Sequence, residues 1–455
     1  MQNQSSTLHY LTAEAKALLL LSLPIIITQL ATNGMTFVDT AMAGQASAAD
    51  LAAIAVGSSL WLPASLLLRG TLMILTPVTA HHRGANNQKS ISTDLAQTVW
   101  IALLSVLALA FYLNNGETIL NYMKVAPEVV PTAVGYLNAL AFGLPGIALF
   151  YTLNSFLEGM GNTRAPMVIS VAGLLINIPV NYVLIYGKFG FPAMGAVGCG
   201  WATSLVYWLM SLLMFAYIRF HHRYAHLVDF KQMVPSTGRI KELLRLGLPI
   251  GISICMCGSI FAVIALLIGK LGASNIAAAQ IALNFSSMTY MIPMSLSFGI
   301  TIRVGFSLGQ KNTWEAKQRA ISGVITAIAL AGISTACILL FRESIVDLYT
   351  TDPAIKQSAM FLLILAASYQ ISDALQASTS GALRGYKDTN MPMILSCGAY
   401  WGIALPMGYI FAMTDWITPA LGTTGFWVGI ITGLSLAALL LAIRLIKLVN
   451  KPIPV

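Results

Sequence analysis

Two carboxylic acids lie inside long apolar stretches of the sequence. Asp39 stands in GMTFVDTAMAG and Asp373 in SYQISDALQAS, and an extended apolar run precedes each. A charged side chain at the centre of a membrane helix costs about 2.5–3.5 kcal/mol on insertion scales, so such residues usually serve ion or substrate chemistry. A carboxyl group there can bind and release a proton, or it can hold Na⁺ together with neutral oxygens. The plainer alternative for each acid is a hydrated position near a helix end.

Two amides offer uncharged partners for such an acid. Asn177 and Asn181 in LLINIPVNY are four residues apart, so their side chains share one face of a helix. They could take part in ion handling, or they could simply join neighbouring helices by hydrogen bonds.

A third polar and methionine-rich stretch reads AAAQIALNFSSMTYMIPMSLSF. Met288 and Met291 are three residues apart in it, and Gln280 and Asn284 precede them by one to three turns. Flexible, polarizable methionines form surfaces that adapt to varied shapes. Beside a membrane acid they predict a pocket for organic cations, and the alternative is ordinary packing against lipid or core.

The elements that must position these residues are membrane helices. Hydrophobic residues make up 57% of the 455 residues and charged residues 9%, whereas soluble domains contain about 45–50% and about 25%. A spanning helix needs about 20 mainly apolar residues. Twelve segments meet this length, near 17–40, 52–80, 93–113, 131–156, 166–187, 195–219, 244–269, 277–307, 319–341, 355–380, 391–414 and 422–447.

The basic residues predict the orientation of these segments. Eighteen of the 25 lysines and arginines fall in the two tails and the even-numbered loops, and five fall in the odd-numbered loops. The positive-inside rule therefore places both termini in the cytoplasm, and it explains the net charge of +9 without a nucleic-acid partner. Arg303, near a helix end, is expected to anchor at the interface. Arg69 lies deeper, where it pairs with an acid such as Asp39 or reaches the outer interface.

The chain also repeats itself. Pro24 of LSLPIII recurs as Pro249 of LGLPIGI, 225 residues later, and EGMGNTRAPM around Gly159 matches RGYKDTNMPM around Gly385 at an offset of 226. A repeat of six helices, an even number, gives two halves of the same orientation, which is typical of transporters. We expect an amino-terminal six-helix lobe over 1–219, a cytoplasmic linker over 220–243 and a carboxy-terminal lobe over 244–455.

Enzyme motifs are lacking in this sequence. There is no G-x-x-x-x-G-K-[ST] phosphate loop and no HExxH metal motif. GFSLG, which begins at Gly305, fits G-x-S-x-G but ends a membrane helix, without the strand-turn-helix context of that motif. We therefore expect no enzyme activity and no cofactor.

Taken together, the motifs resemble those of the multidrug and toxic compound extrusion (MATE) transporters, in their NorM-like branch. The resemblance runs nearly end to end and rests on GMTFVDTAMAG, LAAIAVGSSLWLP, GLLINIPVNYVLIYGKFG, GAVGCGWATS, QIALNFSS, IRVGFSLG, SYQISDALQ, SGALRGYKD and GFWVG. It implies an all-α, V-shaped membrane protein of the bacterial inner membrane, surrounded by lipid and able to act as a monomer. It also implies secondary active export of cationic amphipathic drugs in exchange for H⁺ or Na⁺. The alternative is a flippase for lipid-linked saccharides on the same two-lobed plan.

The resemblance further implies roles for particular residues of the amino-terminal lobe. Asp39 resembles the first-helix acid that couples transport to the cation, and Pro24 resembles the proline about which that helix bends. The residues that support the acid are, by the same resemblance, Tyr136, Asn177, Asn181 and Thr203.

In the carboxy-terminal lobe, Asp373 and Tyr369 resemble the tenth-helix pair of a second acidic site, and Gln280 resembles a drug-contacting position. Na⁺-coupled relatives carry a glutamate in the seventh helix, where this chain has Cys257. A thiol cannot supply a hard anionic oxygen ligand. H⁺ is therefore the expected coupling ion, and no metal site is assigned, although Asp39 could still hold Na⁺.

Overall fold

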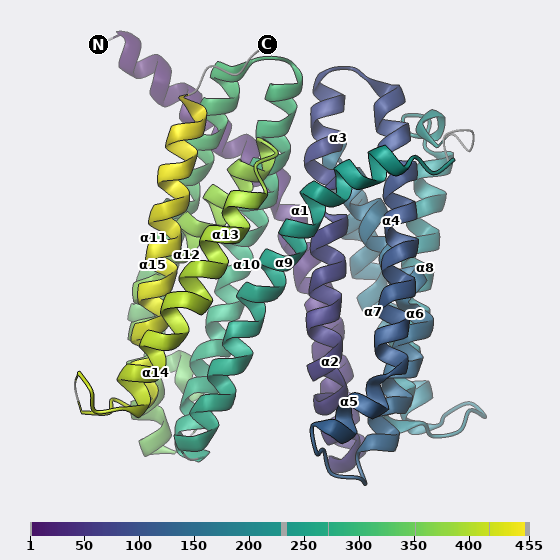
Figure 1. The fold of residues 1–455 in the computed structure, drawn as a ribbon, viewed down its shortest axis with the longest axis vertical. Coiled ribbons are helices and arrows are strands. Elements are labelled where there is room, and N and C mark those ends of the chain that lie inside the picture. Colours follow the sequence, from purple (N-terminus) through teal and green to yellow (C-terminus); the bar gives the residue numbers. More distant parts are fainter. Residues whose placement is uncertain (1, 229–233, 272, 351, 418, 451–455) are drawn as a thin grey trace. The chain divides into compact units, whose positions relative to one another are not determined.

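The computed structural model describes residues 2–228, 234–271, 273–350, 352–417 and 419–450. Within these ranges every regular element is a helix, and Figure 1 follows them from the purple α1 to the yellow α15. The helices are α1 (Gln2–Ala46), α2 (Ala48–Leu72), α3 (Leu75–Gly84), α4 (Gln88–Asn114), α5 (Gly116–Tyr122), α6 (Val130–Gly159), α7 (Arg164–Tyr186), α8 (Gly195–Phe220), η1 (Ala225–Leu227), α9 (Thr237–Ile268), η3 (Gly269–Leu271), α10 (Ala273–Gly309), α11 (Thr313–Asp347), α12 (Pro353–Gly385), α13 (Asn390–Ala399), η4 (Tyr400–Ala404), α14 (Leu405–Met413) and α15 (Thr423–Val449).

Twelve helical segments of the described chain are long and apolar enough to cross a membrane, as predicted. Two of the predicted segments are interrupted. A turn at Met73 and Ile74 separates α2 from α3. In the eleventh segment, a π-helical turn, η4, separates α13 from α14, and Pro406 follows it. A proline has no N–H for the intrahelical ladder, so the helix changes its hydrogen-bond pattern around it.

The chain packs as two compact units, and each takes part of a helix from the other half of the sequence. Unit 2 is Leu23–Ile252, and unit 1 combines Met1–Ser22 with Ser253–Val455. Helices α1 and α9 are therefore divided between the units. The division of α1 follows Ser22, just before Pro24, and that of α9 follows Ile252, just after Pro249. The predicted lobes, 1–219 and 244–455, follow the sequence repeat and not this packing, and they stay a prediction.

The first part of α1 packs within unit 1 on α10 and α11. Leu18 and Ser22 lie directly against Gly299 of α10, where a glycine permits close approach. The carboxylate of Glu14 accepts hydrogen bonds from the guanidinium of Arg303, and Arg319 approaches the same carboxylate to 3.7 Å. The expectation that Arg303 lies at the membrane interface stays a prediction, and the structure adds that its charge is paired with Glu14.

The first part of α9 packs within unit 2 in a matching way. Gly251 lies against Gly70 and Thr71 of α2. Arg239 donates from Nε and Nη2 to the two carboxylate oxygens of Asp94, at 2.6 and 2.7 Å, and Nε2 of His82 lies 3.0 Å from the same carboxylate. Helix α9 thus begins at Thr237, inside the stretch predicted as linker.

The pair Glu14–Arg319 in unit 1 and the pair Arg239–Asp94 in unit 2 occupy equivalent positions of the repeat, with acid and base exchanged. Glu14 and Arg239 are 225 residues apart, and so are Asp94 and Arg319. In unit 1 the acid, Glu14, is on the divided helix α1, and Arg319 is on α11. In unit 2 the acid, Asp94, is on α4, and Arg239 is on the divided helix α9. A charge-assisted contact therefore joins the first part of α1 to the rest of unit 1, and another joins the first part of α9 to the rest of unit 2.

Close helix packing within unit 1 follows from small residues. Helices α10, α11 and α15 all pack on α12. On α15, Gly429 meets the backbone of Ala404 and Gly408, and Gly433 meets Ala404 and Ala399. Without a hydrophobic driving force between helices in lipid, such small-residue contacts supply much of the packing energy.

Candidate ion and substrate sites

Unit 2 brings Asp39, Asn177, Asn181 and Thr203 together from three helices. Oδ1 of Asp39 on α1 accepts hydrogen bonds from Nδ2 of Asn181 at 2.6 Å and of Asn177 at 3.2 Å, both on α7. Oδ2 accepts one from the hydroxyl of Thr203 on α8 at 2.7 Å. Asp39 is 8% exposed and both amides are fully buried. The carboxyl group is thus fixed by three donors in an enclosed polar cluster.

The two amides also form a short chain of their own. Nδ2 of Asn181 donates to Oδ1 of Asn177 at 2.9 Å, whereas Oδ1 of Asn181 is buried and has no hydrogen-bond partner within the described ranges. An orphaned acceptor at this depth has lost its water and gained nothing in return. A proton on Asp39 or a bound cation would supply what this oxygen lacks.

Tyr136 of α6 forms part of the same surroundings without a hydrogen bond to the acid. Its ring packs against Gly57 of α2 and Gly200 of α8, which leave room for it. Its hydroxyl lies near Ser58, and its charge environment includes Asp39. Tyr136 therefore encloses the cluster instead of contacting the carboxyl group.

Pro24 lies in α1, some four turns before Asp39. It has no N–H to donate to Leu20, and its own carbonyl accepts an additional bond from the hydroxyl of Thr28 at 2.9 Å. The division between the two units falls just before it. The helix is thus weakened at the place where it passes from one unit to the other.

The second predicted acid, Asp373, has a different setting in unit 1. It is 8% exposed on α12, and no donor among the described residues reaches its carboxyl group. Tyr369, Tyr290 and Cys257 lie near enough for its charge to act on them. The two predicted acids thus differ in kind, one held by three donors and one bare in an aromatic and thiol environment.

The predicted drug-contacting residues lie on α10. Gln280, Asn284 and Met288 are spaced by four and follow one exposed face of the helix, and Met291 is half-buried. Nε2 of Gln280 donates to Oδ1 of Asn284 at 3.3 Å. No hydrogen bond joins this face to Asp373 within the part of the chain that the structure describes. A link to α12 comes instead from Gln370, which donates to Thr289 at 2.6 Å.

Sequence reasoning missed three further buried acids, Glu14, Asp94 and Glu158. The predicted fourth segment ended at residue 156, but α6 continues to Gly159 and buries Glu158 to 4% exposure. Its Oε1 accepts from Nδ2 of Asn154 at 2.9 Å. The charge of Arg69 acts on it, and the same guanidinium lies over the ring of Tyr151, 5.7 Å from the centroid. Arg69 forms no ion pair with any described residue, so neither of its two expected settings is shown, and its role stays a prediction.

The described residues contain no cluster of three or more His, Cys, Asp or Glu side chains that could hold a metal ion. What the Asp39 cluster offers is hard oxygen, from a carboxylate, an amide and a hydroxyl, which suits a proton or an alkali cation.

These features define a class of protein: a polytopic helical membrane protein built from a repeat, with buried acids inside its helix bundles. The MatE family model matches the chain twice, over residues 24–183 and 249–410, and the two matches begin 225 residues apart. The chain belongs to the MatE family. The prediction of an all-α membrane protein with twelve helices in two parallel six-helix repeats is confirmed.

Three known proteins show how far the similarity extends. The chain is 44% identical over 433 residues to the probable multidrug resistance protein NorM of Shewanella oneidensis, covering 95% of this chain and 94% of that protein. It is 45% identical over 437 residues to the multidrug resistance protein PmpM of Pseudomonas aeruginosa, covering 96% and 92%. The outward-facing structure of a multidrug resistance MATE family transporter of the MOP superfamily superposes with a TM-score of 0.86 at 22% identity, covering 96% of this chain and 97% of that one. The first two are named multidrug resistance proteins, the third is named a transporter, and none of the three names is that of an enzyme.

Proposed function

We propose that this protein exports cationic, amphipathic drug-like compounds across the bacterial inner membrane in exchange for H⁺, with both termini in the cytoplasm. The names of the relatives, multidrug resistance proteins, support the substrate class. The observation that carries the coupling is the carboxyl group of Asp39, enclosed by Asn177, Asn181 and Thr203. Na⁺ is the alternative ion at this cluster.

In the proposed cycle, a proton from outside binds Asp39 and removes the acceptor charge that holds the three donors. The protonated carboxyl is itself a donor and needs an acceptor, and the orphaned Oδ1 of Asn181 supplies one after a rotation of that amide. This rearrangement acts on α1 beyond Pro24 and expels the drug. Return to the inward-open state then releases the proton into the cytoplasm.

At one-to-one exchange of H⁺ for a singly charged drug no net charge crosses the membrane, so the pH gradient alone drives export. A second H⁺ per cycle would add about 2.3 kcal/mol per 100 mV, which corresponds to roughly a fiftyfold drug gradient. Asp373, Tyr369 and the exposed face of α10 with Gln280, Asn284, Met288 and Met291 are proposed to contact the drug. The protein is proposed to work as a monomer.

The test is ethidium transport in proteoliposomes, with a pH gradient and a Na⁺ gradient imposed separately. We expect export driven by the pH gradient in the wild type, loss of it in Asp39→Asn, and full activity in the control Glu343→Gln, which alters an exposed carboxylate. Transport that requires Na⁺ would replace H⁺ as the coupling ion. Transport with neither gradient dependence, in wild type and variant alike, would overturn the antiport proposal.

A further inference from the structure

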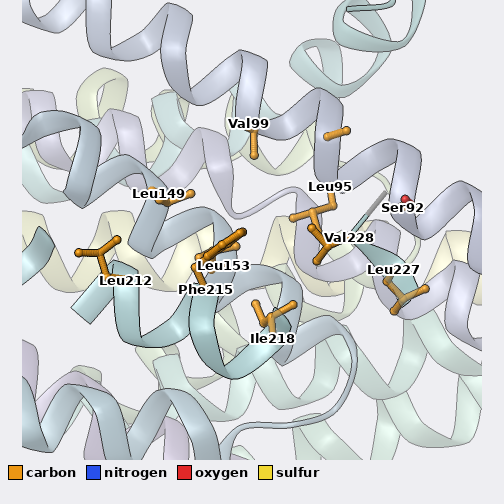
Figure 2. A pocket seen from close by; sticks show the side chains of 11 residues that line it. Ser92, Leu95, Val99, Leu149, Leu153, Leu212, Phe215, Ile218, Leu227 and Val228 are labelled. Carbon is orange, nitrogen blue, oxygen red and sulfur yellow. The ribbon is translucent and has the colours of Figure 1, made fainter. Parts of the chain in front are cut away.

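Unit 2 contains an apolar cavity apart from the Asp39 cluster. It lies between α4, α6 and α8, and the segment around η1 closes one end of it, with a volume of about 280 Å³ (Figure 2). Ten of its eleven lining residues are apolar, among them Leu95, Leu153 and Phe215. From Ser92 to Val99 along α4 it extends about 10 Å. A cavity of this shape and polarity fits part of a hydrocarbon chain.

The single polar lining residue is Ser92. Its side chain is 7% exposed, and its buried Oγ has no hydrogen-bond partner among the residues that the structure describes. Figure 2 shows this oxygen among the side chains of the cavity wall. A buried hydroxyl costs free energy unless something bonds to it. A bound molecule with a donor or acceptor at this point would offset that cost.

Two cations stand at the end of the cavity where Ser92 lies. On α4, Lys89 precedes Ser92 by three residues and Ala96 by seven; on α8, Arg219 follows Phe215 by four and Leu212 by seven. These spacings place each cation on the helix face that lines the cavity. Both side chains are exposed, and neither forms an ion pair with any described residue.

We propose that this cavity binds an anionic phospholipid, with one acyl chain between α4, α6 and α8 and the phosphate at Lys89 and Arg219. Ser92 donates to an ester carbonyl of the lipid, which lies between the phosphate and the acyl chain. An exported organic cation is disfavoured here because both nearby charges are positive. Because lipid tails are as apolar as the cavity wall, selectivity must come from the headgroup.

The experiment uses the detergent-purified full-length protein with dioleoyl phosphatidylglycerol or dioleoyl phosphatidylcholine added, so that only the headgroup differs. Native mass spectrometry counts the bound lipids, and the unfolding temperature is followed in parallel. We expect the wild type to retain phosphatidylglycerol preferentially. Each basic contact contributes about fivefold in affinity, so the double variant Lys89→Gln/Arg219→Gln should bind it at least tenfold more weakly.

Matched variants separate the cavity from the general membrane surface. Ala96→Phe fills the cavity and should abolish retention, whereas Ala108→Phe, at an exposed position of the same helix, should leave it intact. Lys188→Gln/Arg342→Gln removes two exposed cations elsewhere and serves as the charge control. Equal retention of both lipids by the wild type, or unchanged phosphatidylglycerol binding in the cation variant, would overturn the proposal. Occupancy by detergent alone would overturn it as well.

Discussion

Removing the guanidinium of Arg239 should release the first part of α9 from unit 2. Asp94 is 1% exposed, and Arg239 supplies two of its three close contacts. Breaking a buried ion pair from one side costs about 3–5 kcal/mol, because the other charge is left uncompensated. Arg239 is itself 25% exposed and His82 remains, so we expect Arg239→Ala to cost about 2–3 kcal/mol. For a unit of this size the loss corresponds to a fall in Tm of about 5–10 °C.

Thermal unfolding of the purified protein measures this effect, with Lys241→Ala as the control. Lys241 is exposed on the same turn of α9 and forms no ion pair with the described residues, so its loss should shift Tm by less than about 2 °C. The double variant Asp94→Leu/Arg239→Met removes both charges and should recover more than half of the lost stability. Equal Tm values for Arg239→Ala and Lys241→Ala would refute the reasoning, and so would a double variant as unstable as the sum of its single changes.

Three further predictions follow from single contacts. Thr203→Val keeps the shape of the side chain but removes the donor to Asp39, so ethidium export should fall about tenfold. Thr203→Ser keeps the hydroxyl donor and should keep the export rate. Equal export rates for the two variants would exclude a role for this hydrogen bond. Gly429→Ala places a Cβ about 2.5 Å from the carbonyl oxygen of Ala404 and should lower the free energy of unfolding by about 1–3 kcal/mol. Gly402→Ala meets nothing within 4 Å and should be neutral or stabilising. Thermal unfolding compares the two variants, and a similar fall in Tm for both would contradict the packing argument. Glu158→Leu removes the acceptor of the Asn154 amide and should lower Tm more than Glu158→Gln, which retains an acceptor. The reverse order would show that this hydrogen bond does not offset the cost of burying a polar side chain.

The sequence predicted the number and type of helices because apolar length is a local property. It also predicted that Asn177 and Asn181 share a face, since four residues make about one helical turn, and the structure has both amides on one carboxylate. The role of Thr203 was predicted only from the family resemblance, because nothing in its local sequence marks it as a partner of Asp39.

Other features escaped prediction for physical reasons. Glu158 lies beyond the end of an apolar run, where burial depends on how far neighbouring helices extend. The contact between Glu14 and Arg303 joins residues 289 positions apart, and no local pattern encodes it. The repeat did hold a signal that could have pointed to the ion pairs, because the offset of 225 aligns Glu14 with Arg239 and Asp94 with Arg319, an acid with a base in each case.

The exchange of helix segments between the units sets an order for assembly during synthesis. Unit 2 is complete once the chain has been made to Ile252, including the first part of α9. In the described part of the chain, Leu18 and Glu14 in the first part of α1 contact α10 and α11, which are made later. At about 5–20 residues per second, that segment waits on the order of 15–60 s after its own synthesis. During this interval Glu14 lacks both of its arginine partners. Unit 1 can therefore complete its packing only after the later helices have been made and have met the first part of α1.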